Sequence, residues 1–134
     1  MSLEISRSVR EGVTILRLQG RLVAGEETTK LRDTVRDLAA EGVTNAVLDL
    51  EKVDYIDSTG LGGMVICFTT LRKAGGALKL LNLNRRNIEL LLLTKLSTVF
   101  EVFRDEQEAV NSFFPDRALK PFDILQFVQE NKEK

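Results

Sequence analysis

The sequence predicts an α/β domain with a central, mixed β-sheet and helices packed on it. Extended and helical patterns alternate along the chain in the order β-β-α-β-α-β-α-β-α, which is typical of a sheet covered by helices. The first two extended stretches are separated only by Glu11-Gly12, so they predict an antiparallel hairpin. The chain has 134 residues, of which 43% are hydrophobic, and this is enough for one domain with a substantial core.

Two strands and a helix open this order. Residues 3–9 alternate apolar and polar side chains, and residues 13–20 form the second extended run. Residues 25–42 carry apolar side chains at helical spacing, and Gly42 suits the end of that helix. Residues 45–50 are a short apolar run, which predicts a buried strand. The helix face that we expect in the core consists of Thr28, Leu31, Val35, Leu38 and Ala39.

The same alternation continues in the second half of the chain. An apolar stripe at helical spacing follows a glycine-rich turn and ends at Ala74-Gly75-Gly76. The later patterns predict a strand, a mostly buried helix, another strand and a helix that Asp105 caps. The stripe consists of Leu61, Met64, Val65, Phe68 and Leu71. The four later elements occupy residues 77–83, 85–96, 98–103 and 105–114.

The end of the chain stands apart from this alternation. Pro115 and Pro121 bracket "PDRALKP", which predicts a connector, and residues 122–134 predict a short helix with one apolar face. We therefore divide the chain into a domain at 1–114 and a connector with a C-terminal helical extension at 115–134. Two interpretations of the helix stay open. It folds back onto its own domain, or it docks on a partner or on a second copy, which would give a homodimer.

Composition narrows the classes of function. The formal net charge is −1, which argues against direct, broadly electrostatic binding to nucleic acid. No stretch is long and apolar enough to insert into a membrane, and the N-terminus lacks a secretory signal pattern. The lone cysteine, Cys67, is compatible with a reducing compartment. We therefore expect a cytoplasmic location.

The sequence also argues against an enzyme. It contains no histidine, which excludes a Ser-His-Asp triad and histidine-ligated zinc. Asp54 and Asp57 are a carboxylate pair without a catalytic constellation nearby, and Cys67 lies close to the apolar stripe, as a core thiol would. Arg85-Arg86 are interpreted as solvated charges. We expect no catalytic residue, no metal and no cofactor.

The stretch "DSTGLGG", residues 57–63, allows three interpretations. Glycine turns before helices bind phosphates, but the dinucleotide pattern fails at Val65 and no G-K-[ST] tripeptide is present. Alternatively, Asp57, Ser58 or Thr59 caps a helix whose glycines let it lie close to the sheet. In the third interpretation the glycines clear space for another protein's backbone and Ser58 is exposed for phosphorylation. We favour the third, because alanines would pack nearly as closely and favour the helix.

A longer stretch strengthens this interpretation by resemblance. "DYIDSTGLGGMVICFTTLRKAGGALKLLNL", residues 54–83, resembles the centre of the STAS domain proteins that act as bacterial anti-sigma-factor antagonists. The resemblance implies the STAS fold over about residues 3–114. It also implies binding to an anti-sigma factor that is a serine kinase, phosphorylation of Ser58 by that kinase, and reversal by a phosphatase. ATP and magnesium would belong to the kinase.

The resemblance also implies a docking surface around the serine. The family often carries a G-E-[LI]-D pattern after the second strand, whereas "GRLVAG" places Arg21 and Val23 there. The alternative function is an unswitched scaffold or transport-accessory STAS domain without a cognate kinase, in which the motif serves only as a docking surface. The expected partner-binding residues are Asp57, Ser58, Thr59, Gly60, Leu61, Gly62, Gly63, Arg21 and Val23.

Overall fold

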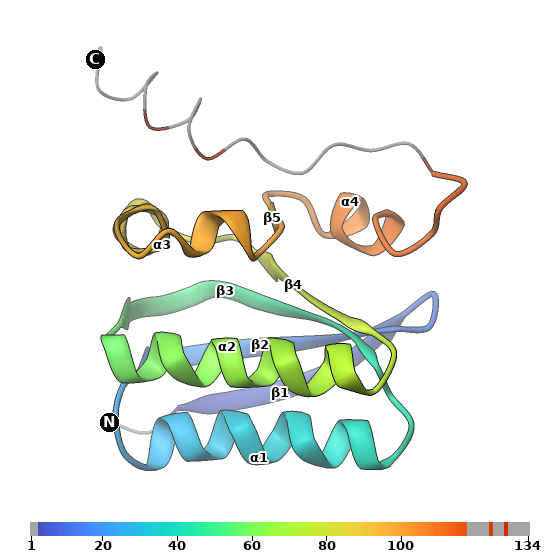
Figure 1. Cartoon of the computed structure of the whole chain (residues 1–134), viewed down its shortest axis with the longest axis horizontal. Coiled ribbons are helices and arrows are strands. Elements are labelled where there is room, and N and C mark those ends of the chain that lie inside the picture. Colours follow the sequence, from blue (N-terminus) through green and yellow to red (C-terminus); the bar gives the residue numbers. More distant parts are fainter. Residues whose placement is uncertain (1–2, 118–123, 125–127, 129–134) are drawn as a thin grey trace.

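The computed structural model describes residues 3–117 together with Ile124 and Val128. Its strands and helices follow the predicted order (Figure 1). In chain order they are β1 (Glu4–Arg10), β2 (Val13–Leu22), α1 (Glu26–Ala40), β3 (Asn45–Ile56), α2 (Ser58–Lys73), β4 (Ala77–Leu81), α3 (Arg85–Leu93), the 3-10 turn η1 (Leu96–Thr98), β5 (Val102–Phe103) and α4 (Glu106–Asn111).

The strands form a mixed five-stranded sheet in the order β1-β2-β3-β4-β5. β1 is antiparallel to β2, and the other neighbours pair in parallel. The hairpin between β1 and β2 turns at Glu11 and Gly12, whose φ angles of 52° and 85° are both positive. This is the backbone geometry of a tight turn that matches the twist of two antiparallel strands. The predicted mixed sheet and hairpin are confirmed.

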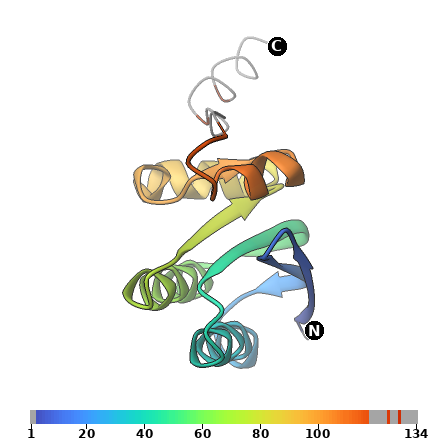
Figure 2. The same ribbon diagram turned by 90° about the vertical axis from the view of Figure 1, so that its right-hand side faces the viewer.

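Helices cover both faces of the sheet, and the two faces have separate apolar cores. α1 and α2 lie side by side on one face (Figure 2). Their buried side chains join those of α3 in the main core, whereas α4 contributes Ala109 and Val110 to a second, smaller core. Val47 and Leu48 of β3 belong to different cores, as the alternation of side chains along a strand requires. The central strand is therefore buried on both faces.

Several elements differ from their predicted lengths. β4 ends at Leu81 rather than at residue 83, and α4 spans only Glu106–Asn111 of the predicted 105–114. β3 continues to Ile56 rather than ending at residue 50, and its pairing with β2 contains register shifts that break the alternation of its side chains. The helix predicted over 85–96 ends at Leu93, and β5 contains only two residues. Lys95 directly precedes η1 and has a φ angle of 63°, so the chain turns where the sequence suggested a continuous helix and strand.

The predicted C-terminal helix lies outside the described residues, apart from two of its apolar side chains. Ile124 is 7% exposed and belongs to the main core, and Val128 packs against that core. α4, by contrast, belongs to the second core. These two contacts favour the interpretation in which the segment folds back onto its own domain. Docking on a second copy stays a prediction.

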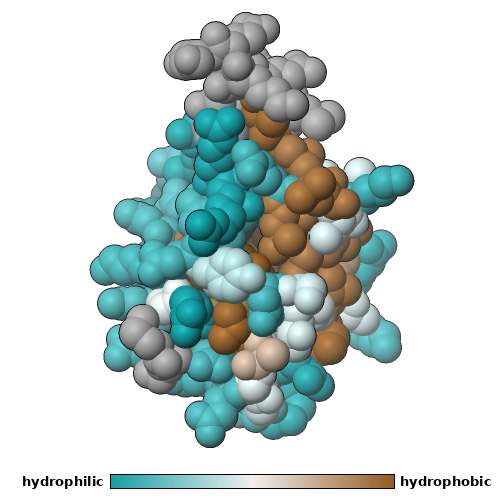
Figure 3. Space-filling model, turned by 90° about the vertical axis from the view of Figure 1, so that its left-hand side faces the viewer, coloured by the Kyte–Doolittle hydropathy of each residue, from teal (hydrophilic) through white to brown (hydrophobic). Residues whose placement is uncertain are grey.

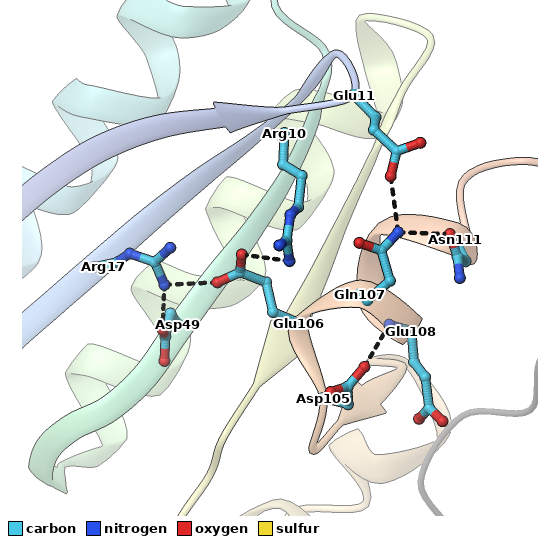
Figure 4. Close-up of polar contacts among 9 residues, drawn as sticks. All are labelled: Arg10, Glu11, Arg17, Asp49, Asp105, Glu106, Gln107, Glu108 and Asn111. Carbon is cyan, nitrogen blue, oxygen red and sulfur yellow. Dashed lines mark hydrogen bonds and ion pairs between the residues drawn. The ribbon is translucent and has the colours of Figure 1, made fainter.

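An ion-pair cluster attaches α4 to the strands (Figure 4). Arg17 on β2 contacts Asp49 on β3 and Glu106 on α4, with each N–O distance at 2.8 Å, and Arg10 contacts the other oxygen of Glu106 at 2.9 Å. Asp105 caps the helix as predicted, because its carboxylate accepts a hydrogen bond from the Glu108 N–H. Glu106 thus joins a helix of six residues to two strands.

Replacing Glu106 tests this attachment. Glu106→Gln removes the shared carboxylate of both arginines, and these side chains are partly exposed. We expect the free energy of unfolding to fall by about 0.5–1 kcal/mol, with a smaller loss at high salt. Urea denaturation measures the change. Glu108→Gln is the control, since it removes an exposed charge from the same first turn. Equal effects of the two variants would contradict a specific role for the cluster.

Candidate functional site

The carboxylate of Asp57 joins two segments that lie far apart in the sequence. One oxygen accepts a hydrogen bond from the Gly60 N–H at 2.7 Å, and so caps α2. The other accepts from the Ala24 N–H at 3.0 Å, in the loop after β2. The Asp57 N–H donates to the Leu22 carbonyl at 3.1 Å. The capping interpretation is therefore correct, and the same side chain also holds the loop 23–25 beside the start of α2.

Two of the three glycines serve contacts inside the domain. A Cβ on Gly60 would overlap the carbonyl oxygen of Leu22, and a Cβ on Gly63 would crowd the side chain of Thr28. Gly62 is exposed, and a Cβ there would meet no atom within 4 Å. The interpretation of the glycines as clearance for a partner is thus wrong for Gly60 and Gly63. An alanine would not pack nearly as closely there, because backbone and a buried side chain occupy the space.

The predicted site residues gather at one edge of the sheet, but only some reach its surface. β2 and β3 are parallel and end at Leu22 and Ile56, which pair with each other, so the segments that follow both strands meet. Of the predicted residues, the exposed ones are Arg21, Ser58, Thr59 and Gly62, the half-buried ones are Val23 and Asp57, and the buried ones are Gly60, Leu61 and Gly63.

Ser58 is the first residue of α2 and its side chain is exposed. The first backbone N–H groups of a helix have no partner within the helix and give this end a partial positive charge. Asp57 already accepts from the Gly60 N–H, so the cap is complete without the serine. Capping of α2 therefore does not depend on the Ser58 hydroxyl.

A shallow groove lies beside Ser58 and was not predicted from the sequence. Its volume is about 270 Å³, and it lies between the end of β3, the start of α2 and α3. Leu93 is 82% exposed and Tyr55 is 39% exposed. Figure 3 shows hydrophobic side chains along this end of the molecule, where α2 begins. The groove is lined by Tyr55, Ser58, Arg86, Glu89, Leu90 and Leu93, among others.

The groove was missed because the prediction placed α3 mostly in the core. Only Asn87, Ile88 and Leu91 of this helix are buried. Four consecutive leucines, residues 90–93, span more than a full turn of helix, so they cannot all face the sheet. Leu91 faces the core and Leu93 faces solvent. The run of leucines is the signal that could have indicated an exposed apolar surface.

The described residues lack the features of a metal site and of a membrane span. They contain no cluster of three or more His, Cys, Asp or Glu side chains that could hold a metal ion. Among the same residues, no helix has the length and apolar character that a membrane crossing needs. Cys67 is buried, and burial raises the pKa of its thiol to about 12. The thiol therefore stays protonated at neutral pH, and Cys67 is the core residue that the sequence predicts.

Comparisons with known proteins agree with this geometry. The STAS domain family matches residues 4–109. An anti-sigma-B factor antagonist of Bacillus subtilis (strain 168) is 40% identical over 72 residues, which are 54% of this chain and 65% of the relative. The anti-sigma-B factor antagonist of Listeria monocytogenes is 41% identical over 61 residues, 46% of this chain and 54% of the relative. Both matches span less than two thirds of the relatives' lengths.

Solved structures share the fold. A candidate anti-sigma factor antagonist of Thermotoga maritima has a TM-score of 0.76 and 24% identity, with 81% of this chain and 93% of that chain covered. The Bacillus cell fate determinant SpoIIAA in its phosphorylated form has a TM-score of 0.63 and 20% identity, with 82% and 97% covered. These likenesses confirm the predicted STAS-like mixed α/β fold.

A pair of alanine substitutions tests the two roles of the glycines. Gly60→Ala would place a methyl group against the Leu22 carbonyl, and we expect the free energy of unfolding to fall by about 3 kcal/mol. The methyl group of Gly62→Ala would meet no atom within 4 Å. Because alanine favours a helix more than glycine does, we expect this variant to raise the free energy of unfolding by about 0.5–1 kcal/mol. Urea denaturation measures both. Changes of the same sign would contradict the geometry.

A substitution of Asp57 tests the link to the loop. Asp57→Ala leaves the Gly60 and Ala24 N–H groups without their acceptor. We therefore expect the free energy of unfolding to fall by about 1–3 kcal/mol. Amide hydrogen exchange should accelerate at both residues. Ser58→Ala is the control, because no hydrogen bond of its side chain holds either segment among the described residues. Unchanged exchange at Ala24 in Asp57→Ala would refute the link.

Proposed function

Because the chain belongs to the STAS domain family, we propose that it is an anti-sigma-factor antagonist that phosphorylation of Ser58 switches off. It sequesters an anti-sigma factor with serine kinase activity, and a phosphatase restores the binding form. The observation that carries the proposal is an exposed Ser58 on a helix start that Asp57 already caps. The names of the Bacillus and Listeria relatives support the class of partner.

The switch acts on the complex rather than on the fold. A phosphate adds about −1.5 to −2 charges, and the start of α2 favours such a charge by roughly 0.3–1 kcal/mol. The neighbouring Asp57 carboxylate opposes it by about 1–4 kcal/mol, depending on the effective dielectric. The repulsion is the larger contribution, but water screens it at the exposed Ser58, and it stays below the stability of about 5–15 kcal/mol that is typical of a domain. The domain therefore keeps its structure. Burying an unpaired dianion at an interface costs several kcal/mol, and each 1.4 kcal/mol is tenfold in affinity.

The docking surface extends from Ser58 in two directions. On one side lies the loop after β2, with exposed Arg21 and half-buried Val23. On the other side lies the groove with Tyr55 and Leu93. The exposed apolar side chains of the groove supply area for burial against the anti-sigma factor. Gly60 and Gly63 act from beneath this surface, because they allow α2 to approach Leu22 and Thr28.

This function needs no chemistry from the chain beyond its serine hydroxyl. The kinase supplies ATP and magnesium, so the antagonist acts as a binding protein rather than an enzyme. Regulation of transcription follows from release of the sigma factor and involves no direct contact of this chain with DNA. A cytoplasmic location and the division into 1–114 and 115–134 complete the proposal.

Variants of Ser58 test the switch. The kinase that co-purifies with the unphosphorylated chain is incubated with it and Mg-ATP, and mass spectrometry locates the phosphate. We expect phosphate on Ser58 and at least tenfold weaker binding of the modified chain to the kinase. Ser58→Ala should bind without being switched, and Ser58→Asp should bind poorly. Thr59→Ala is the control, because Thr59 is the neighbouring exposed hydroxyl.

Two outcomes would reject this proposal. Phosphate elsewhere, with Ser58 untouched by the kinase, would exclude the switch at this residue. Recovery of a transporter or signalling scaffold without a kinase would instead support an unswitched STAS domain. The residues that favour this alternative are Arg21 and Val23, which stand at the two positions where the family often has acidic residues.

A further inference from the structure

We propose that Arg86 is the counter-charge for a phosphate on Ser58, an inference that rests on the proposed phosphorylation of Ser58. Both residues line the groove of about 270 Å³ between the start of α2 and α3. Arg86 lies in the first turn of α3 and is exposed. Its guanidinium carbon lies over the ring of Tyr55, 5.8 Å from the ring centroid. A phosphate on Ser58 would thus enter a groove that already contains a cation.

The charges around the groove single out Arg86. Both carboxylate oxygens of Asp57 accept hydrogen bonds from backbone N–H groups. Glu89 forms an ion pair with Arg85, with an N–O distance of 3.2 Å. Within the part of the chain that the structure describes, Arg86 has no carboxylate at ion-pair distance and only the Tyr55 ring as a partner. It is therefore the cation of this groove that can accept a new anion without breaking an ion pair.

The phosphate is a stronger partner for Arg86 than the ring. An exposed cation–π contact is weak because water screens it. Arginine offers paired N–H donors that match the geometry of phosphate oxygens, and such charge-assisted hydrogen bonds are shorter and stronger than neutral ones. A phosphate within reach would therefore draw the guanidinium away from Tyr55.

This exchange would alter the docking surface in two ways. The ring of Tyr55 would lose the guanidinium that lies over it, and the groove would lose its unpaired positive charge. A partner with an acidic side chain for Arg86 would then lose an attraction, in addition to the repulsion from the phosphate itself. Phosphorylation would thus affect the surface of α3 as well as the start of α2.

The pairing is testable on the full chain with phosphoserine incorporated at position 58 during translation. Phosphorus NMR follows the second ionisation of the phosphate as a function of pH. A nearby cation stabilises the dianion, so it lowers the pKa of the phosphate. We expect Arg86→Gln to raise this pKa by about 0.3 unit or more, which is about a twofold change in the protonation constant. Arg86→Lys, which keeps the charge, should recover part of the difference.

Arg85→Gln is the matched control, because it removes the same charge one residue earlier from an existing ion pair. A smaller shift in Arg85→Gln than in Arg86→Gln supports the inference. Equal shifts in the two variants, or an unchanged pKa in Arg86→Gln, would overturn it. Amide spectra of each variant establish that it is folded.

The result is independent of any kinase, because translation supplies the phosphate. A kinase that ignores Ser58 would reject the proposed function while the titration still measures the pairing. Conversely, an unchanged pKa would reject the role of Arg86 while a switch at Ser58 could still operate by repulsion alone. The two experiments therefore fail separately.

Discussion

The candidate site depends on the contact between the start of α2 and the end of β2. Asp57 accepts hydrogen bonds from Gly60 in its own helix and from Ala24 in the loop, and Gly60 lies directly against the Leu22 carbonyl. A side chain at position 60 or a missing carboxylate at position 57 would separate the two segments. Ser58, Arg21 and Val23 share one surface only because this contact holds.

The same contact explains how a glycine-rich segment can begin a helix. Glycine weakens a helix by about 0.8–1 kcal/mol relative to alanine, and three of the first six residues of α2 are glycines. Tertiary packing rather than local propensity stabilises most protein helices. Here the packing partners are Leu22 and Thr28, and the cap is Asp57. Gly60 and Gly63 are poor helix formers, but they allow α2 to approach Leu22 and Thr28 closely. Ser58 comes directly after the capping residue Asp57 and is exposed.

The features that could be predicted from the sequence are those that depend on local patterns of residues. The order of elements, the hairpin at Glu11-Gly12 and the cap at Asp105 depend on near neighbours. Non-local features were less accessible. The full length of β3 depends on its irregular pairing with β2, and the role of Gly60 depends on Leu22, which precedes it by almost forty residues. To predict the groove between α2 and α3, one must know which way each leucine of residues 90–93 faces, and this depends on how α3 packs.

The pairing of β2 with β3 makes the surface around Ser58 dependent on correct folding of the domain. Leu22 and Ile56 are brought level by register shifts along the two strands, and both the loop and the helix start follow directly from them. A molecule whose strands paired one residue out of register would turn its side chains to the wrong faces. It would also misplace the Leu22 carbonyl relative to Gly60. If Ser58 is phosphorylated as proposed, a kinase that recognises the assembled surface would act only on correctly folded copies, and the phosphorylated fraction would report folding as well as signalling.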